Sequence, residues 1–173
     1  MIVVAVMFLL GINSAVAGMR EELAQAKKVS TLAERITAID ALMPRLDDNL
    51  KAQALVYKGW TLQGMGKTAE AKVCFEEVIA LNSCKWYVAK ALVSLAEIVP
   101  DKTEKLGYLQ KVLDNPTHSY QATIEALKQM PTLIEKDEYK ELLANVLYKT
   151  PATEKNADLL SFIKSEQEKL KKI

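Results

Sequence analysis

The sequence predicts an all-α protein in which short loops join antiparallel helices into a stack. Three observations lead to this prediction. No stretch alternates apolar and polar residues with enough β-branched side chains to form a strand. All five prolines fall where helices would end or connect. The 173 residues are 50% hydrophobic and 26% charged, which suits one folded domain with a sizeable core.

Composition excludes several classes of function. Lys plus Arg is 23 and Asp plus Glu is 22, so no excess of charge points to nucleic acid or to an anionic membrane surface. A single histidine, His118, leaves little material for a zinc site or for histidine-based catalysis. The two cysteines, Cys74 and Cys84, are too few to form the framework of a disulfide-rich fold. We expect them to be free thiols, with pairing of Cys84 between molecules as the alternative.

The N-terminal segment differs from the rest of the chain. Residues 1–10 are apolar, and no charged side chain occurs before Arg20. Small residues at an A-x-A spacing follow in the run from Ala15 to Gly18, which is the pattern of a signal-peptide cleavage site. We therefore predict an export signal over residues 1–17 and a mature domain over residues 18–173, in the periplasm or otherwise exported. The alternatives are a retained membrane anchor and a buried N-terminal helix, because no Lys or Arg precedes the apolar run.

Capping and breaking residues divide the remainder into helices. Thr31 with Glu34 and Thr132 with Glu135 each form a T-x-x-E pattern, which is typical of a helix start. Pro44 interrupts an apolar stripe between residues 29 and 50, so that this region is a degenerate repeat or cap rather than a coiled coil. The expected helices cover residues 19–29, 32–43, 48–64, 68–81, 85–98, 102–114, 118–130, 133–149 and 153–171.

The segment from Ala52 to Ser83 resembles a tetratricopeptide repeat, a helix-turn-helix unit of about 34 residues. Gly59 occupies the family's small position in the first helix, Ala71 the small position in the second, and Phe75 the aromatic position that follows. Small residues let the paired helices approach closely. This sequence departs from the family's pattern at two positions, where Leu62 replaces an aromatic residue and Ser83 replaces a proline.

The same spacing continues along the chain. Positions equivalent to Phe75 and Ser83 recur after 33 and then 35 residues. Tyr108 and Leu143 follow Phe75 at this spacing, and Pro116 and Pro151 follow Ser83. Two more units are expected, over residues 85–117 and 118–152, although Glu104 and Tyr139 stand where small residues would be expected. The resemblance thus implies a TPR-like helix-turn-helix solenoid, which residues 153–173 would close as a C-terminal capping helix.

The resemblance also implies a binding surface. In this family the first helix of each unit lines a groove that holds an extended peptide or a helix of a protein partner. The corresponding positions of this sequence are Gln53, Val56, Trp60 and Gln63 in one unit, and Trp86, Ala89, Val93 and Ala96 in the next. Tryptophans in such a groove would be binding anchors. The alternative is that each tryptophan fills the gap between repeats.

No constellation of residues predicts an enzyme, a cofactor site or a metal site. The run from Gly64 to Thr68 ends in GKT, but Thr61 stands where a phosphate-binding loop needs glycine, and a helix precedes it instead of a strand. We expect Gly66 to close one helix and Thr68 to open the next. The favoured function is therefore a non-enzymatic scaffold that binds a protein partner and assists assembly or stability of a complex. The alternative is a membrane-anchored structural subunit that retains its N-terminal helix, so contact with a membrane is expected only in that case.

Overall fold

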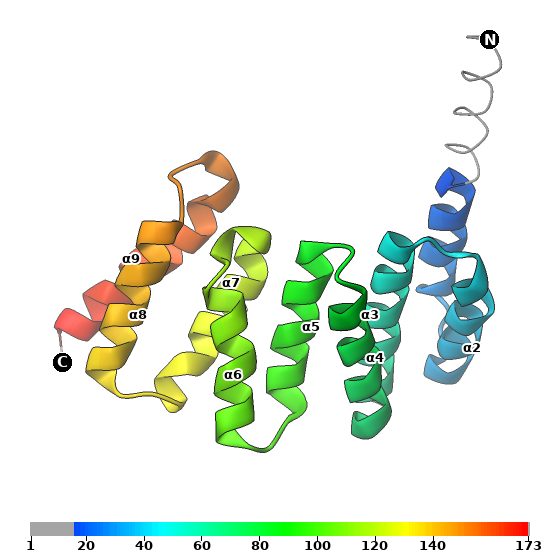
Figure 1. The fold of residues 1–173 in the computed structure, drawn as a ribbon, viewed down its shortest axis with the longest axis horizontal. Coiled ribbons are helices and arrows are strands. Elements are labelled where there is room, and N and C mark those ends of the chain that lie inside the picture. The colour runs from blue at the N-terminus through cyan, green and yellow to red at the C-terminus, as the bar shows by residue number, and fades with distance from the viewer. Residues whose placement is uncertain (1–15, 173) are drawn as a thin grey trace, which may run out of the picture. The chain divides into compact units, whose positions relative to one another are not determined.

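The computed structural model describes residues 16–172, and this range contains helices and turns but no strand (Figure 1). The all-α prediction is therefore confirmed for this part of the chain. The chain divides into two compact units, Met1–Ser83 (unit 1) and Cys84–Ile173 (unit 2). Residues 1–15, which make up all but the last two residues of the expected export signal, lie outside the described range. Among the described residues, no helix has both the length and the apolar character that a membrane crossing requires.

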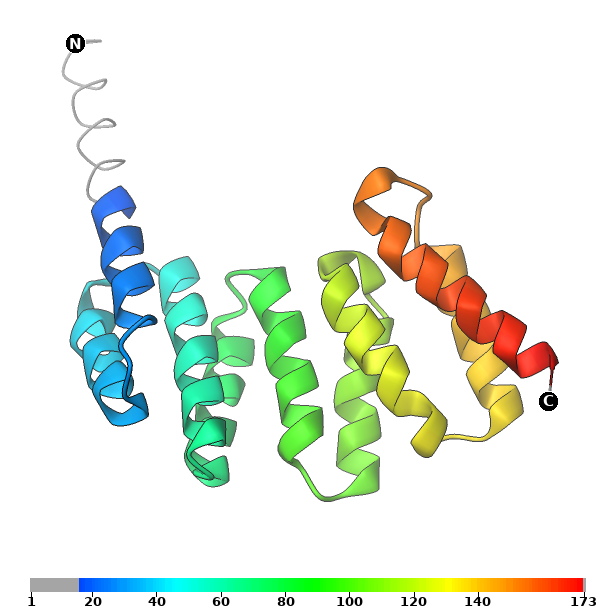
Figure 2. The same cartoon turned by 180° about the vertical axis from the view of Figure 1, so that it is seen from behind.

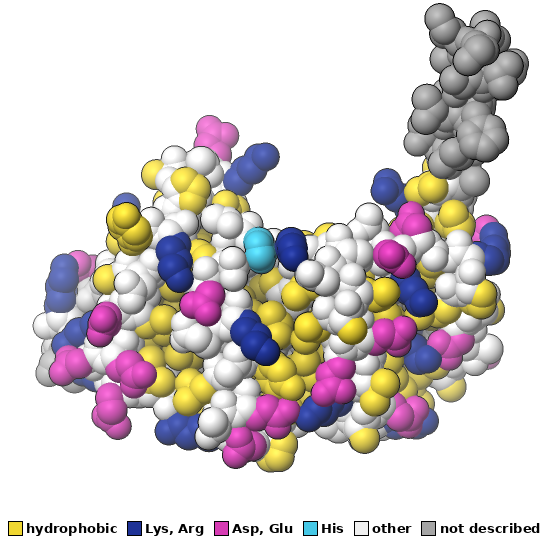
Figure 3. Space-filling view, in the orientation of Figure 1, with side chains coloured by type: hydrophobic (Ala, Val, Ile, Leu, Met, Phe, Trp, Pro, Cys, Tyr) yellow, Lys and Arg dark blue, Asp and Glu magenta, His cyan; other side chains and the backbone are white. Residues whose placement is uncertain are grey.

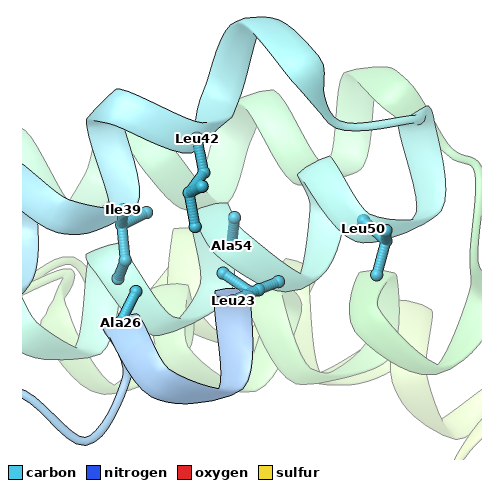
Figure 4. Close-up of a cluster of buried hydrophobic side chains, with 6 residues drawn as sticks. All are labelled: Leu23, Ala26, Ile39, Leu42, Leu50 and Ala54. Carbon is cyan, nitrogen blue, oxygen red and sulfur yellow. The ribbon is translucent and has the colours of Figure 1, made fainter. Parts of the chain in front are cut away.

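Unit 1 contains helical residues 16–26, α2 (Leu32–Leu42), α3 (Asp48–Gly64) and α4 (Thr68–Leu81). The first helical segment ends three residues earlier than the sequence predicted. Arg35 holds the turn that follows it, because Nε and Nη2 of its guanidinium both donate to the carbonyl of Val29, at 3.1 and 2.9 Å. Apolar side chains from these helices form one core cluster (Figure 4), whose members are Leu23, Ala26, Ile39, Leu42, Leu50 and Ala54.

Local capping explains where α2 and α3 begin. The Thr31 hydroxyl accepts the Glu34 N–H, which confirms that α2 begins after Thr31 as predicted. The Glu34 carboxylate accepts from this hydroxyl and not from the Thr31 backbone N–H, so the second bond of the expected capping box is replaced by a contact between the two side chains. Pro44 lies in a short 3-10 turn, Met43–Arg45, which separates α2 from α3 as expected. Asp47 then caps α3 by accepting the Leu50 N–H at 2.8 Å.

A tight turn joins α3 to α4, and the two helices pack closely along their length. Gly66 adopts a left-handed conformation with φ 74°, as predicted. The Gly66 N–H bonds to the carbonyl of Gln63, and the Lys67 N–H reaches the carbonyl of Leu62. These two bonds are those of a Schellman cap, so the GKT run is a helix-ending turn. Thr68 opens α4, which confirms the second half of that prediction.

Unit 2 contains five helices: α5 (Lys85–Ile98), α6 (Lys102–Leu113), α7 (Tyr120–Gln129), α8 (Lys136–Lys149) and α9 (Ala157–Lys171). The pair α5 and α6 packs together closely, and α7 packs against both of them (Figures 1 and 2). The spacing of the sequence suggested that α7 and α8 pair in the same manner. Instead, α9 packs against both α7 and α8.

Three helices of unit 2 begin later than the sequence predicted, because short 3-10 turns precede them. The prediction of a capping box at Thr132 and Glu135 is wrong: Thr132 lies in the turn Met130–Thr132 and its hydroxyl donates to the Gln129 carbonyl. The helix α8 then begins at Lys136 with Glu135 as its N-cap. In front of α7, Ser119 is the N-cap, accepting the Ala122 N–H at 3.2 Å.

The helix α9 separates apolar from polar side chains. Leu159 and Ile163, four residues apart, are completely buried. Asp158, Ser161, Lys164 and Ser165 are exposed on its other side. A terminal helix of a helical stack needs such a polar outer side, and α9 has one while its buried residues complete the core of unit 2.

Candidate functional site

Two clusters that combine aromatic rings with a lysine, one in each unit, are the strongest candidates for a functional site. In unit 1, the rings of Tyr57 and Trp60 meet edge to face, with centroids 5.3 Å apart and planes at 78°. Both lie on α3 three residues apart, so they share one side of the helix. The Lys27 ammonium lies 4.2 Å from the centroid of the Tyr57 ring, close enough for a cation–π interaction. Partial burial lowers the pKa of Lys27 from its ordinary value.

In unit 2, Trp86 and Tyr87 at the start of α5 form a second edge-to-face pair, with centroids 4.8 Å apart and planes at 88°. Trp86 is 42% exposed, which is unusual for so large an apolar side chain. Lys90, one helical turn further along α5, places its ammonium 5.7 Å from the centroid of the Trp86 ring. The cluster thus offers the partly exposed ring of Trp86 as an aromatic surface, with the positive charge of Lys90 beside it.

An ion pair fixes that cation. The Lys90 Nζ lies 3.0 Å from both carboxylate oxygens of Glu125 on α7, and the Lys90 residue is only 8% exposed. The Gln121 amide donates to the same carboxylate at 2.9 Å. A buried ammonium needs an anionic partner because burial removes its hydration. The pair therefore holds α5 to α7 beside Trp86.

The residues that the sequence placed on a groove divide into accessible and buried sets. Trp86 is exposed, and Gln53, Trp60 and Gln63 are half-buried. Val56, Ala89, Val93 and Ala96 are buried, with at most 4% exposed, so their side chains offer a partner no surface in this structure. A role of the accessible residues in protein binding stays a prediction.

Sequence reasoning missed the partners of both tryptophans. Tyr57 precedes Trp60 by one helical turn and Lys90 follows Trp86 by one, so helical spacing could have found them. Lys27 and Glu125 come from other helices, and nothing in the sequence marked their approach. Only packing of the tertiary structure brings them to the aromatic rings.

The described residues contain no group of three His, Cys, Asp or Glu side chains that could hold a metal ion. Both cysteines are free, as predicted. Burial raises the pKa of the Cys74 thiol to about 11, so at neutral pH it is protonated and a poor nucleophile.

The charged side chains of the described residues do not form a patch of one sign on the face that Figure 3 shows. Acidic and basic side chains are interspersed there, in keeping with the net charge of +1. In the GKT turn, for example, the Lys67 ammonium pairs with the Glu70 carboxylate at 3.1 Å.

No family model, curated protein or solved structure matches this chain. Functional proposals for the chain therefore rest on its own residues and their geometry.

Proposed function

We propose that this chain is a non-enzymatic scaffold that binds a protein partner and assists the assembly or stability of a protein complex. The observation that carries the proposal is the aromatic pair Trp86–Tyr87 beside the Lys90 ammonium, in which Trp86 is exposed and Tyr87 is half-buried. Tryptophan and tyrosine supply much of the binding energy in protein interfaces, because each buries a large rigid surface and keeps a polar group for hydrogen bonding. The half-buried pair Tyr57–Trp60 of unit 1 is the second candidate contact.

Packing in unit 1 supports a tetratricopeptide-like architecture for this scaffold. A Cβ atom added at Gly59 would lie 2.5 Å from Cε1 of the Phe75 ring, so α3 and α4 touch where the repeat pattern calls for small residues. Ala71 and Phe75 are completely buried at the matching positions of α4. The polar outer face of α9 supports its assignment as the capping helix of such a solenoid. The A-x-A pattern at residues 15–17 supports export, and we propose that the scaffold acts in the periplasm or another exported compartment, with a retained membrane anchor as the alternative.

Truncation of Trp86 tests the proposal. A tagged chain that begins at Gly18 is used to capture partners from extracts of the source cells, with soluble and detergent-solubilised membrane fractions assayed separately. Trp86→Ala should weaken capture of the specific partner by about thirtyfold, since an aromatic hot spot contributes about 2 kcal/mol or more. The unfolding free energy of this variant should fall by less than truncation of a core tryptophan would cost, because 42% of the Trp86 surface is already exposed in the folded protein.

Tyr148 supplies the matched control. It is 93% exposed on α8, outside both aromatic clusters. Tyr148→Ala removes a comparable aromatic side chain and should leave capture unchanged. Equal capture by the Trp86→Ala variant and the unaltered chain would contradict the proposal. Trp60→Ala, tested in parallel, should weaken capture if Trp60 contacts the partner, whereas a loss of about 3–5 kcal/mol in unfolding free energy would mark it as a core residue.

A further inference from the structure

Two adjoining hollows in unit 2 form a surface that the aromatic clusters do not use. Their volumes are about 470 and 610 Å³, and they share Lys136 and Leu170 as lining residues. We call this combined surface the α8–α9 groove. Its walls come from the start of α6, the connection between α7 and α8, the first turns of α8 and the last turn of α9. Figures 1 and 2 both show the α7–α8 connection at the same end of unit 2 as the start of α6.

Four apolar side chains form one part of the lining of the groove, which we call its floor. Pro131, Leu133, Ile134 and Leu170 line it, and the last three of these are only half-buried. Leu133 and Ile134 belong to the turn that replaces the expected first turn of α8, so no neighbouring helix covers them completely. Such a floor can receive an apolar side chain of a ligand, and removal of that side chain from water would favour binding.

The rim of the groove is basic. Its lining includes Lys102, Lys136, Lys140 and Lys171, but Glu135 is the one carboxylate among the lining residues of the two hollows. Lys140 and Lys171 each pair with a carboxylate three residues away on their own helix, at 2.8 and 2.7 Å. Exposed pairs of this kind contribute little stability, so a ligand's carboxylates can replace the partners of these lysines.

From this combination we infer that the α8–α9 groove binds an acidic segment of a partner protein, anchored by one apolar side chain. The lysines would attract carboxylates on either side of the anchor, and the apolar floor would receive the anchor itself. Concave hollows of about 470 and 610 Å³ fit a peptide side chain better than a lipid surface, because a flat bilayer cannot follow a concave surface. The groove shares no residue with the Trp86–Tyr87 pair, so this inference and the proposed function can fail separately.

Synthetic peptides with a fluorescein label test the inference by fluorescence anisotropy, with the chain from Gly18 onward. The first probe carries a central leucine between two glutamates on each side. We expect this probe to bind, and we expect a serine in place of the leucine to weaken binding by about fivefold or more. Lysines in place of the glutamates should abolish binding, and raised salt should weaken binding of the acidic probe.

A variant in which two lysines of the rim are replaced by glutamate tests whether their positive charge attracts the acidic peptide. Lys102→Glu with Lys136→Glu should weaken binding of the leucine probe by roughly tenfold or more. The matched control, Lys155→Glu with Lys164→Glu, makes the same change in net charge at exposed lysines that do not line the groove. Circular dichroism checks that both variants keep their helical content.

Three outcomes would overturn the inference. One is equal binding of the leucine and serine probes, and another is equal loss of binding in the two double variants. The third is binding to phosphatidylglycerol vesicles with no binding of the acidic peptides, which would assign the lysines to a membrane surface instead. If the peptides fail to bind while Trp86-dependent capture persists, the scaffold function stands and only the groove assignment is lost.

Discussion

At the scale of single residues, the absence of a side chain at Gly59 determines how closely two helices approach. An added Cβ would lie 2.5 Å from Cε1 and 2.7 Å from Cζ of Phe75, both well inside van der Waals contact. Phe75 is completely buried, and close packing of protein interiors leaves such a ring little room to move. The close packing of α3 on α4 therefore requires glycine at position 59, since any other residue would place a Cβ atom against the Phe75 ring.

Substitution of Gly59 by alanine should destabilise the protein although alanine is the better helix former. Alanine gains about 1 kcal/mol of helix propensity, and overpacking against a fixed ring costs more, so we expect a net loss of about 1–3 kcal/mol in unfolding free energy. Gly107→Ala on α6 is the matched control, because nothing lies within 4 Å of its added Cβ. That variant should be neutral or more stable by about 0.5–1 kcal/mol. Urea denaturation measures both, and equal effects at the two glycines would show that the Gly59 contact is unimportant.

The ion pair beside Trp86 gives a second prediction at this scale. Glu125→Gln leaves the buried Lys90 ammonium without an anion, so unfolding free energy should fall by about 1–3 kcal/mol, reduced because the Glu125 side chain is 33% exposed. Replacing both residues by methionine removes the unpaired charge and should recover most of that loss. Chemical denaturation of the single and double variants gives the comparison. If the double methionine variant is as unstable as Glu125→Gln, then packing of the two side chains, and not their charges, holds α5 to α7.

At the scale of secondary-structure elements, the sequence predicted helix positions well where a local signal marks the boundary. Gly66 is left-handed and Thr31 caps the start of α2, as their sequence patterns indicate. The start of α8 was wrong because two local structures compete for Thr132. Its hydroxyl can cap a helix or bond to the carbonyl of Gln129, and Pro131 favours the 3-10 turn in which the second bond forms.

The candidate site was less predictable than the helices because it depends on contacts between them. Helical spacing identifies which side of α5 carries Trp86, but it does not indicate that Glu125 of α7 approaches Lys90. Burial is likewise a tertiary property. Val56 and Trp60 are one turn apart on α3, yet Val56 is completely buried while Trp60 keeps part of its surface exposed. The resemblance to a tetratricopeptide repeat implied that both line the same groove, with packing between repeats as the alternative for Trp60.

The pairing of α3 with α4 leads to a prediction at this scale. Ala71 is completely buried where α4 packs within unit 1, so Ala71→Leu should overpack the core and lower unfolding free energy by about 1–3 kcal/mol. Ala80→Leu on the same helix is the control, because Ala80 is exposed and the added side chain reaches solvent. Thermal unfolding followed by circular dichroism measures both variants. An unchanged melting curve for Ala71→Leu would show that the small position of the repeat is assigned incorrectly.

At the scale of the whole molecule, the core of unit 1 determines how much of the N-terminal region the folded protein needs. Leu23 is completely buried in the core cluster and Ala26 is 6% exposed, so the helix that carries them is part of the fold. Arg45 adds a paired contact from the turn after α2, donating from two guanidinium nitrogens to the Glu22 carboxylate at 2.8 and 3.0 Å. Val16 and Met19 pack on the same cluster only partly buried. Cleavage after Ala17 would therefore remove little of the core.

Export with cleavage at this position is the last prediction. N-terminal sequencing of the protein from its source cells should give Gly18 as the first residue, because the A-x-A pattern ends at Ala17. A recombinant chain that begins at Gly18 should unfold close to the temperature of the full-length chain, since Leu23 and Ala26 remain in place. A chain that begins at Lys27 is the control: it loses both core residues, and removal of a buried leucine side chain alone costs about 2–5 kcal/mol. Recovery of a protein that still carries Met1 from the membrane fraction would contradict cleavage and favour the membrane-anchored subunit.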